Sequence, residues 1–169
     1  IALQLTPAQK QQVLQPLAYY LMQAGVREIP LQDARTVIAP HLAEVSMHMQ
    51  PDEFLQDIQN TSGLLLERDP GIYGFAHLTF QEYLAAVYIK EKGSEEVLVD
   101  KIEDSWWHET IRLYCAQADA TKIIEACLAE TRPSTAALTL AFECNEEKLK
   151  AQPSVIQRID ELLEKGVED

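Results

Sequence analysis

The chain has 169 residues, and 14 basic against 27 acidic side chains give it a formal net charge of −13. With 47% hydrophobic and 24% charged residues, its composition is that of a globular protein rather than a disordered one. The longest apolar run, Tyr83–Ile89, is far shorter than the ~20 residues that span a membrane, so we expect no membrane segment. The acidic charge also disfavours nucleic acid as a partner, because Lys and Arg supply most non-specific affinity for phosphate.

The cysteines indicate the compartment. Cys115, Cys127 and Cys144 form an odd set without a CxxC pair, and no histidine lies at zinc-binding spacing from them. We expect them to be buried and reduced, as in a cytoplasmic protein. The chain begins at Ile1 rather than at methionine, so we also expect it to be part of a longer protein.

Helical signals dominate the first 63 residues. Thr6 and Gln9 form a capping box with Pro7 at the first helical position, and Gly25 is the expected stop of this helix, which Pro16 should kink. A short extended piece follows and ends at Pro30. Two further helices are expected over 32–43 and from residue 51 to the glycine at 63.

The hydrophobic period then changes. Residues 64–68 and 72–76 flank Asp69-Pro70-Gly71, a turn signal that predicts a β-hairpin. Thr79 and Glu82 suggest a second capping box, with Gln81 also serving the helix start, for a helix that runs to Gly93. Three helices, a hairpin and a closing helix are typical of a winged-helix domain, which we place at residues 1–93.

Residues 94–169 carry no strand signal. Amphipathic segments recur over 95–102, 106–118, 120–130, 134–143 and 154–165. The fold class is therefore mainly α: a winged-helix domain with one β-hairpin, followed over 94–169 by an α-helical bundle. A HEAT-like stack of helical hairpins is one form this bundle can take, although no period defines a repeat.

No motif in the chain points to catalysis. The six glycines form no phosphate-binding loop, and His41 and His48 lack any partner at metal-binding spacing. The acids of the predicted third helix, Asp52, Glu53 and Asp57, lie near its start, where they suit the helix dipole better than acid–base chemistry. We therefore expect a chain that is not itself an enzyme, with no catalytic residue, metal site or cofactor of its own.

The same acids bear on DNA binding. In winged-helix proteins that read DNA, the third helix enters the major groove and the wing contacts the backbone. Here residues 51–60 contain no Lys or Arg, and the hairpin tip offers Arg68 alone, between two acids. Residues 1–89 hold four basic side chains against nine acidic ones. DNA binding by this surface is therefore disfavoured.

One segment resembles a known family. Residues 75–86, Phe75-Ala76-His77-Leu78-Thr79-Phe80-Gln81-Glu82-Tyr83-Leu84-Ala85-Ala86, match the pattern F-x-H-x-[ST]-F-Q-E-[FY]-[FL]-A-A throughout. This pattern is similar to the winged-helix region of NACHT-type signalling NTPases, the STAND class that includes NOD-like receptors and many bacterial proteins. A preceding Gly-Leu-Leu strand and a downstream W-x-E-x-I segment starting at Trp107 fit as well. The resemblance extends over about residues 3–115.

The resemblance implies a regulatory role in signal transduction, such as innate immunity or antiphage defence. In this class an upstream P-loop domain binds ADP or ATP with magnesium, and the winged helix closes over the nucleotide. The histidine of the pattern, here His77, contacts the β-phosphate of ADP and holds a resting monomer, and exchange to ATP allows oligomerisation. The parent protein would be an ATPase, and this chain its regulatory module.

His77 also suits a phosphate on physical grounds. It precedes a predicted helix start, where free N–H groups and the helix dipole favour anions. The expected partners are the upstream nucleotide-binding domain and proteins that contact the helical region. Two alternatives stay open: a winged-helix transcriptional regulator that binds DNA, and a freestanding helical scaffold that binds proteins through residues 94–169.

Overall fold

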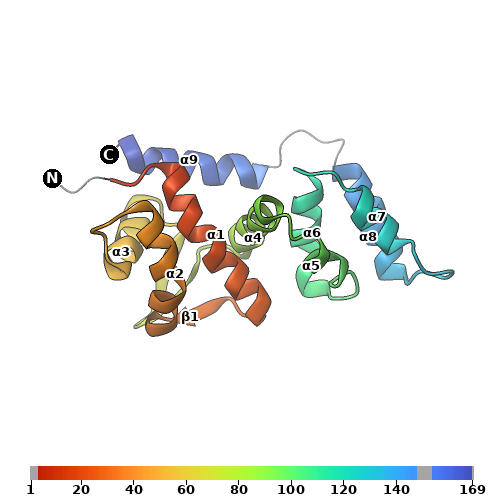
Figure 1. Ribbon diagram of the computed structural model, residues 1–169, viewed down its shortest axis with the longest axis horizontal. Coiled ribbons are helices and arrows are strands. Elements are labelled where there is room, and N and C mark those ends of the chain that lie inside the picture. Colours follow the sequence, from red (N-terminus) through yellow and green to blue (C-terminus); the bar gives the residue numbers. More distant parts are fainter. Residues whose placement is uncertain (1–3, 148–153, 169) are drawn as a thin grey trace.

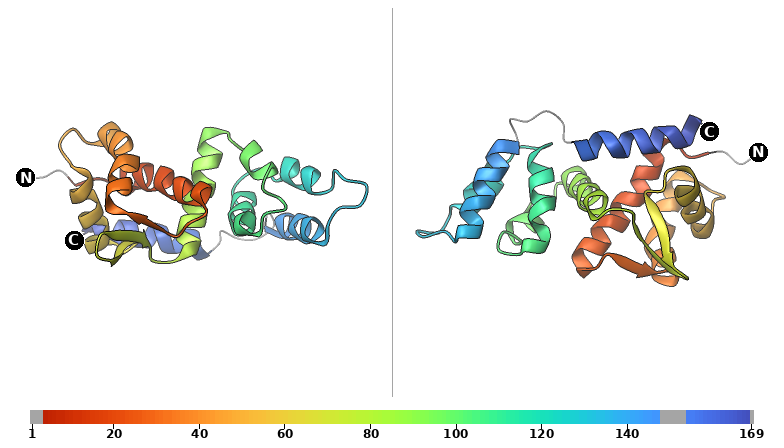
Figure 2. Two further views of the ribbon diagram at one scale, coloured as in Figure 1. Left: turned by 90° about the horizontal axis from the view of Figure 1, so that it is seen from below. Right: turned by 180° about the vertical axis from the view of Figure 1, so that it is seen from behind.

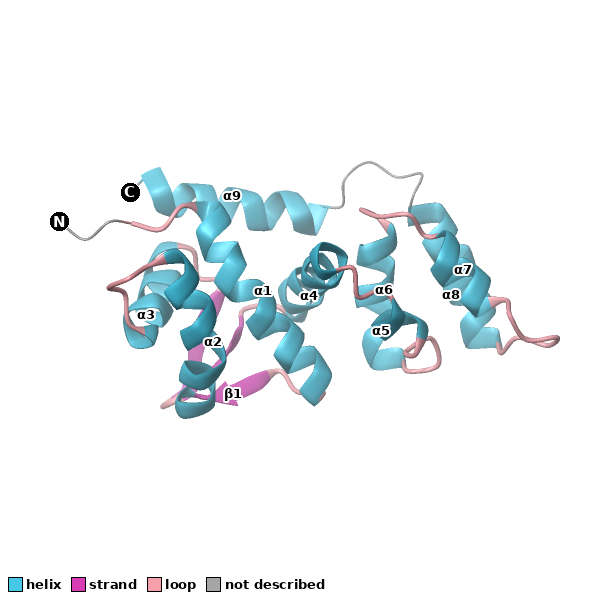
Figure 3. Ribbon diagram, viewed as in Figure 1, coloured by secondary structure: helices cyan, strands magenta, loops and turns pink. Residues whose placement is uncertain are grey.

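The computed structural model describes residues 4–147 and 154–168, and helices make up most of it (Figures 1 and 3). The described elements follow the chain in this order: α1 (Pro7–Ala24), β1 (Glu28–Pro30), α2 (Leu31–Val45), α3 (Pro51–Thr61), β2 (Leu65–Asp69), β3 (Ile72–Phe75), α4 (Leu78–Lys92), α5 (Glu96–Val99), the 3-10 turn η1 (Ser105–Trp107), α6 (His108–Cys115), α7 (Thr121–Cys127), α8 (Thr135–Glu147) and α9 (Ser154–Glu168).

Helix α1 begins and ends at its sequence signals. The Thr6 hydroxyl accepts a hydrogen bond from the Gln9 N–H (3.1 Å), and the Gln9 side chain accepts one from the Thr6 N–H (2.9 Å). At the other end Gly25 adopts a left-handed conformation with φ of 69°. The predicted capping box and stop are therefore confirmed.

The hairpin is confirmed too, and it belongs to a larger sheet. Strands β2 and β3 pair antiparallel across the Pro70–Gly71 turn, where Gly71 has the positive φ that this turn requires. The short strand β1 pairs with the other edge of β3, with Ile29 opposite Tyr73, so the strand order is β1-β3-β2. The extended piece expected before Pro30 is thus the third strand of a sheet.

The winged-helix unit is built around α1, which packs against α2, α4 and α9. Its predicted apolar stripe is fully buried, as are the inward residues of α3. These core residues are Val13, Leu14, Leu17, Ala18 and Leu21 on α1, and Phe54, Leu55 and Ile58 on α3. Figure 2 shows the three strands grouped at one edge of this helical unit.

The predicted start of α4 is wrong. The helix begins at Leu78 with His77 as its N-cap, and no side chain caps it. Thr79 and Glu82 therefore lie inside the helix, and Glu82 is buried rather than reaching back to a cap. Burial of α4 on several sides sets this start, because the helix packs against α1 on one side and α6 on another.

The remaining helices pack in stacked pairs. Helix α6 lies between α4 and α8, and α7 contacts both α5 and α8 (Figure 1). Helix α9 then packs against α1, α3 and α4 of the winged-helix unit. The division of the chain at residues 93/94 stays a prediction.

A hydrogen bond joins the second half of the chain to the first. The indole N–H of Trp106 donates to the carbonyl oxygen of Met22 (3.0 Å), which ties η1 to the end of α1. Cys115, Cys127 and Cys144, on α6, α7 and α8, are all free and buried, as expected. The pKa of the Cys115 thiol is raised mainly by its hydrogen bond with Cys144 and also by burial.

Among the described helices, none combines the length and apolar character needed to cross a membrane.

Candidate functional site

His77 lies at the junction between β3 and α4. Its backbone is extended, its side chain is exposed, and its ring meets the Phe80 ring edge-on, with centroids 5.0 Å apart. Within the described part of the chain, the contact of this ring is the one with Phe80, and no hydrogen bond occupies its nitrogens. The ring is therefore positioned by packing and free to contact a ligand.

Buried neighbours hold the His77 backbone in place. Phe75 on one side and Phe80 on the other are both buried in the core. The Ala76 N–H donates to the carbonyl oxygen of Leu64 (2.8 Å), and the Phe80 N–H donates to that of His77 (3.0 Å). The chain at His77 is thus fixed to the hairpin before it and to the helix after it.

The first turn of α4 favours negative charge. The leading N–H groups of a helix have no acceptor inside it, and its dipole places partial positive charge at this end. No acidic side chain lies in the first turn of α4 to neutralise that charge. His77 is the residue immediately before these groups, so an anion that contacts its ring would also lie near them.

A cavity of about 120 Å³ adjoins this junction. It is lined by residues of β1, β2, β3 and α4 and by the residues just before β1 and just after β3: Arg27, Glu28, Arg68, Phe75, Ala76, Leu78 and Gln81. Ala76 and Leu78 are the residues on either side of His77 in the chain. His77 itself is not among the lining residues, so the cavity adjoins the chain before and after the predicted site residue.

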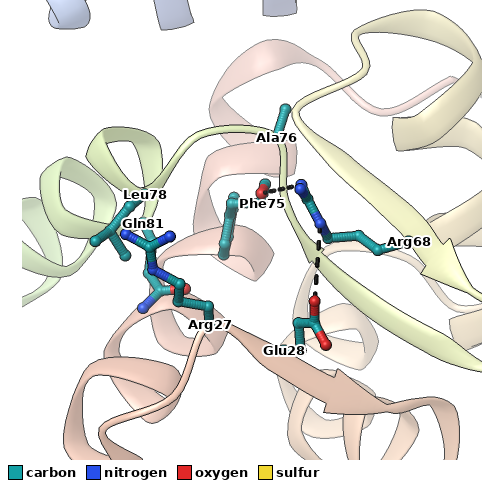
Figure 4. Close-up of a pocket in the computed structure, with 7 residues that line it drawn as sticks. All are labelled: Arg27, Glu28, Arg68, Phe75, Ala76, Leu78 and Gln81. Carbon is teal, nitrogen blue, oxygen red and sulfur yellow. Dashed lines mark hydrogen bonds and ion pairs between the residues drawn. The ribbon is translucent and has the colours of Figure 1, made fainter.

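Two arginines reach this cavity from different elements (Figure 4). The Arg68 guanidinium donates from Nη1 to the carbonyl oxygen of Phe75 (3.1 Å), and its Nε lies 3.9 Å from a carboxylate oxygen of Glu28. Arg27 is exposed, and in Figure 4 its guanidinium extends toward Gln81 and Leu78. The Arg27 side chain makes no hydrogen bond to a described residue, although its charge acts on the Glu82 carboxyl group and opposes the rise in the pKa of that group.

Gly74 allows the strands that carry these arginines to approach closely. A Cβ atom at this position would lie 2.7 Å from the Arg27 carbonyl oxygen and 2.9 Å from Cδ of Arg68. Both distances are well inside van der Waals contact. Only glycine fits at this point of β3 without displacing β1 or the Arg68 side chain.

Gln81 has a structural role different from the one expected. Its side chain is 1% exposed, and its Nε2 donates to the carbonyl oxygen of Val26 (3.1 Å) and contacts the sulfur of Met22 (3.4 Å). It therefore ties the first turns of α4 to the α1–β1 connection instead of serving the helix start. This contact holds the Arg27 backbone next to α4.

Two of the three acids of α3 make ion pairs. The Arg35 guanidinium forms a two-pronged pair with Asp52 at 2.6 and 2.7 Å, and this hydrogen bonding lowers the pKa of Asp52. The Asp57 carboxylate lies 3.5 Å from Nζ of Lys10. In the described ranges, no three His, Cys, Asp or Glu side chains gather as metal ligands would.

The sequence motif identified His77 but not the arginines beside it. Residues 1–89 contain only four Lys or Arg side chains, and two of these four line one small cavity. The scarcity of basic residues in an acidic segment is a signal that could have drawn attention to them. Their convergence, however, depends on strand pairing that the sequence does not display.

Comparison with known proteins identifies the fold. Residues 3–89 match the family described as a winged helix-turn-helix domain C-terminal to NACHT, and this match spans just over half of the chain. No curated protein and no solved structure matches the chain. The matched range contains α1 to β3 and most of α4, including His77 and every residue that lines the cavity. The chain therefore belongs to the family of winged helix-turn-helix domains that lie C-terminal to NACHT domains.

Proposed function

We propose that the chain is the regulatory module of a NACHT-type signalling ATPase. It closes over the upstream nucleotide-binding domain and stabilises the resting state in which ADP is bound. The observation that carries this proposal is the setting of His77: an exposed imidazole, held rigidly at the start of α4, beside a cavity lined by two arginines. In this arrangement the His77 ring contacts the β-phosphate.

The local charge supports an anionic ligand. Residues 1–89 are acidic as a whole, yet Arg27, Arg68 and the N-terminal end of α4 place positive charge together here. Glu28 balances part of the charge of Arg68, at 3.9 Å, whereas Arg27 acts on the Glu82 carboxyl group by charge alone, without a hydrogen bond to a described residue. Arginine suits phosphate because its planar donors match phosphate oxygens, and the helix end adds free N–H groups.

Regulation follows from a difference in affinity. Contacts from His77 to ADP exist only when the module is closed, so they favour the closed state by the free energy of those contacts. By the same linkage, closure slows the loss of ADP. When ATP with magnesium replaces ADP, the module is released and the protomers assemble. Three buried, unpaired thiols suit the reducing cytoplasm, where we expect this switch to act.

The test is His77→Ala in the longer protein that contains this chain. Hydrogen bonds to charged groups contribute about 1.5–3 kcal/mol, so we expect roughly 10- to 100-fold faster ADP dissociation and a larger oligomeric fraction. Fluorescent ADP release and light scattering after size exclusion measure both. His48→Ala is the matched control, because His48 is also exposed but lies between α2 and α3. Unchanged ADP release together with an unchanged monomer fraction would refute the proposal.

A further inference from the structure

The arginine-lined cavity lies on a different side of the chain from the His77 ring. The His77 backbone is extended, with φ of −133° and ψ of 141°, so successive side chains leave it in opposite directions. Ala76 and Leu78 both line the cavity, whereas His77 between them does not. The ring packs instead against Phe80, with centroids 5.0 Å apart. The proposed function assigns the β-phosphate to this ring and assigns the cavity no ligand.

Positive charge is in excess around this cavity. Two guanidinium groups reach it from opposite sides, and among the lining residues they meet one carboxylate, that of Glu28 (Figure 4). Arg68 is partly compensated, since it lies 3.9 Å from a Glu28 oxygen and donates to the carbonyl oxygen of Phe75. Arg27 is exposed and makes no hydrogen bond to a described residue, but its charge acts on the Glu82 carboxyl group. Burial raises the pKa of Glu82 to about 7, so near neutral pH this acid is only partly ionised and offsets Arg27 incompletely.

The backbone that carries Arg27 is fixed before any ligand arrives. The carbonyl oxygen of Val26 accepts a hydrogen bond from Nε2 of the buried Gln81 (3.1 Å), and the Val26 N–H donates to the carbonyl oxygen of Leu21 (3.1 Å). The Arg27 carbonyl oxygen lies against Gly74, 2.7 Å from the point where a Cβ atom would be. An ion that contacts the guanidinium therefore orders one side chain and no backbone, which keeps the entropic cost of binding low.

The size of the cavity restricts its ligand to a small group. Its volume is about 120 Å³, whereas pockets that enclose drug-sized molecules have about 300–1,000 Å³. A single phosphate group fits this volume, but a whole nucleotide does not. Guanidinium groups suit such an ion, because their planar donors match the oxygens of a phosphate in pairs.

We propose that Arg27 and Arg68 form a binding site for one phosphate group in this cavity, separate from the contact made by the His77 ring. The phosphate belongs either to the bound nucleotide, a source that rests on the proposed function, or to free inorganic phosphate, a source that does not. In both cases the ion joins the residue before β1 to β2 across β3 through the two arginines. Occupation of the site therefore stabilises the folded domain by mass action.

The first test adds inorganic phosphate to the whole chain at constant ionic strength and follows the amide NMR signals of residues 74–78. We expect shifts that saturate, and binding at least about fivefold weaker in Arg27→Gln and in Arg68→Gln, because each loses hydrogen bonds to a charged group. Arg132→Gln is the matched control, since Arg132 is exposed in the connection between α7 and α8 and its loss changes the net charge equally. Shifts that do not saturate, or equal weakening in Arg27→Gln and Arg132→Gln, would overturn the proposal.

The Arg68 variant needs a check of its fold, because this side chain also bonds to the Phe75 carbonyl oxygen. Near-ultraviolet circular dichroism provides that check. If Arg68→Gln is unfolded, Arg68→Lys replaces it, and weaker binding is again expected because lysine lacks the planar fork. A folded Arg68 variant that binds phosphate as tightly as the unaltered chain would overturn the site of two arginines.

A second measurement tests whether the site is separate from the His77 ring. During the same titration, the imidazole signals of His77 should move no more than those of His48, which is exposed between α2 and α3. The Nε signal of Arg27 should move with the amides of residues 74–78. If the His77 ring responds at the same phosphate concentrations as Arg27, the ring and the arginines hold one ion together and the proposal is overturned.

The release of fluorescent ADP from the longer protein distinguishes the two sources. If the site takes the nucleotide phosphate, Arg27→Gln should release ADP at least about fivefold faster. If it takes free phosphate, ADP release from this variant changes less than about twofold while its phosphate binding is still weakened. Both results support the phosphate site. The proposed function fails separately, on unchanged ADP release and monomer fraction in His77→Ala.

Discussion

Glu82 offers the sharpest test of how the two halves of the chain pack. This carboxyl group is only 7% exposed, on the α4 helix that packs against α6. Burial raises its pKa to about 7 from an ordinary value of 4.5, and the charge of Glu109 adds to the rise. The positive charges of Arg112 and Arg27 oppose this rise in pKa, but the Arg112 guanidinium is already paired with the Glu109 carboxylate at 2.9 Å. The neutral acid is therefore the form that this interface favours.

The sign and size of the effect follow by linkage. Because the folded-state pKa is raised, the folded chain holds a proton that the unfolded chain has lost between pH 4.5 and about 7. Wild-type stability is therefore highest, for this group, below about pH 4.5 and falls as the pH rises through about 7. A rise in pKa of this size lowers the free energy of unfolding by about 3 kcal/mol at a pH where the carboxyl group is ionised. Glutamine is close in shape to glutamate and stays neutral, so Glu82→Gln removes this pH-dependent loss of stability.

The assay is urea unfolding at several pH values. We expect Glu82→Gln to be more stable than wild type by up to about 3 kcal/mol at pH 8, and the difference to shrink toward zero near pH 4.5. Glu91→Gln is the matched control, since Glu91 is an exposed glutamate on the same helix. A Glu82→Gln variant that is less stable than wild type at pH 8, or equally shifted at every pH, would refute the reasoning.

Two further predictions concern the sheet and the acidic surface. Gly74→Ala should destabilise the chain by about 1–3 kcal/mol in urea unfolding, because its Cβ would press on the Arg27 carbonyl at 2.7 Å; an unchanged midpoint would contradict this. The chain should not shift a random DNA duplex in an electrophoretic assay at low salt, since α3 carries no Lys or Arg. A retarded DNA band that weakens as salt is added would contradict this and support a DNA-binding function.

Local signals in the sequence were sufficient for most helices. The ends of α1 follow from residues within four positions of each end: the Thr6 and Gln9 pair, and Gly25 with its positive φ. Strand β1 could be seen only as an extended piece. Its pairing with β3 joins Glu28 to Gly74, and no local pattern encodes a contact over that separation in sequence.

The start of α4 shows where a local signal loses to packing. Thr79 and Glu82 have the spacing of a capping box, but a cap would place Glu82 at an exposed helix end. In the structure Glu82 is buried at the contact with α6, and Gln81 is occupied by the Val26 carbonyl. These partners lie far along the chain, so tertiary contacts decide where the helix begins.

The four basic residues of the first 89 positions connect the fold with the site. Lys10 is 2% exposed and paired with Asp57 of α3, and Arg35 is paired with Asp52 of the same helix. The other two, Arg27 and Arg68, line the cavity beside His77 because β1 and β2 pair with opposite edges of β3. Two cations therefore pair with two of the three acids of α3, and two line the cavity at the α4 junction. The strand pairing that the sequence hides is thus also what concentrates positive charge next to His77 in an otherwise acidic domain.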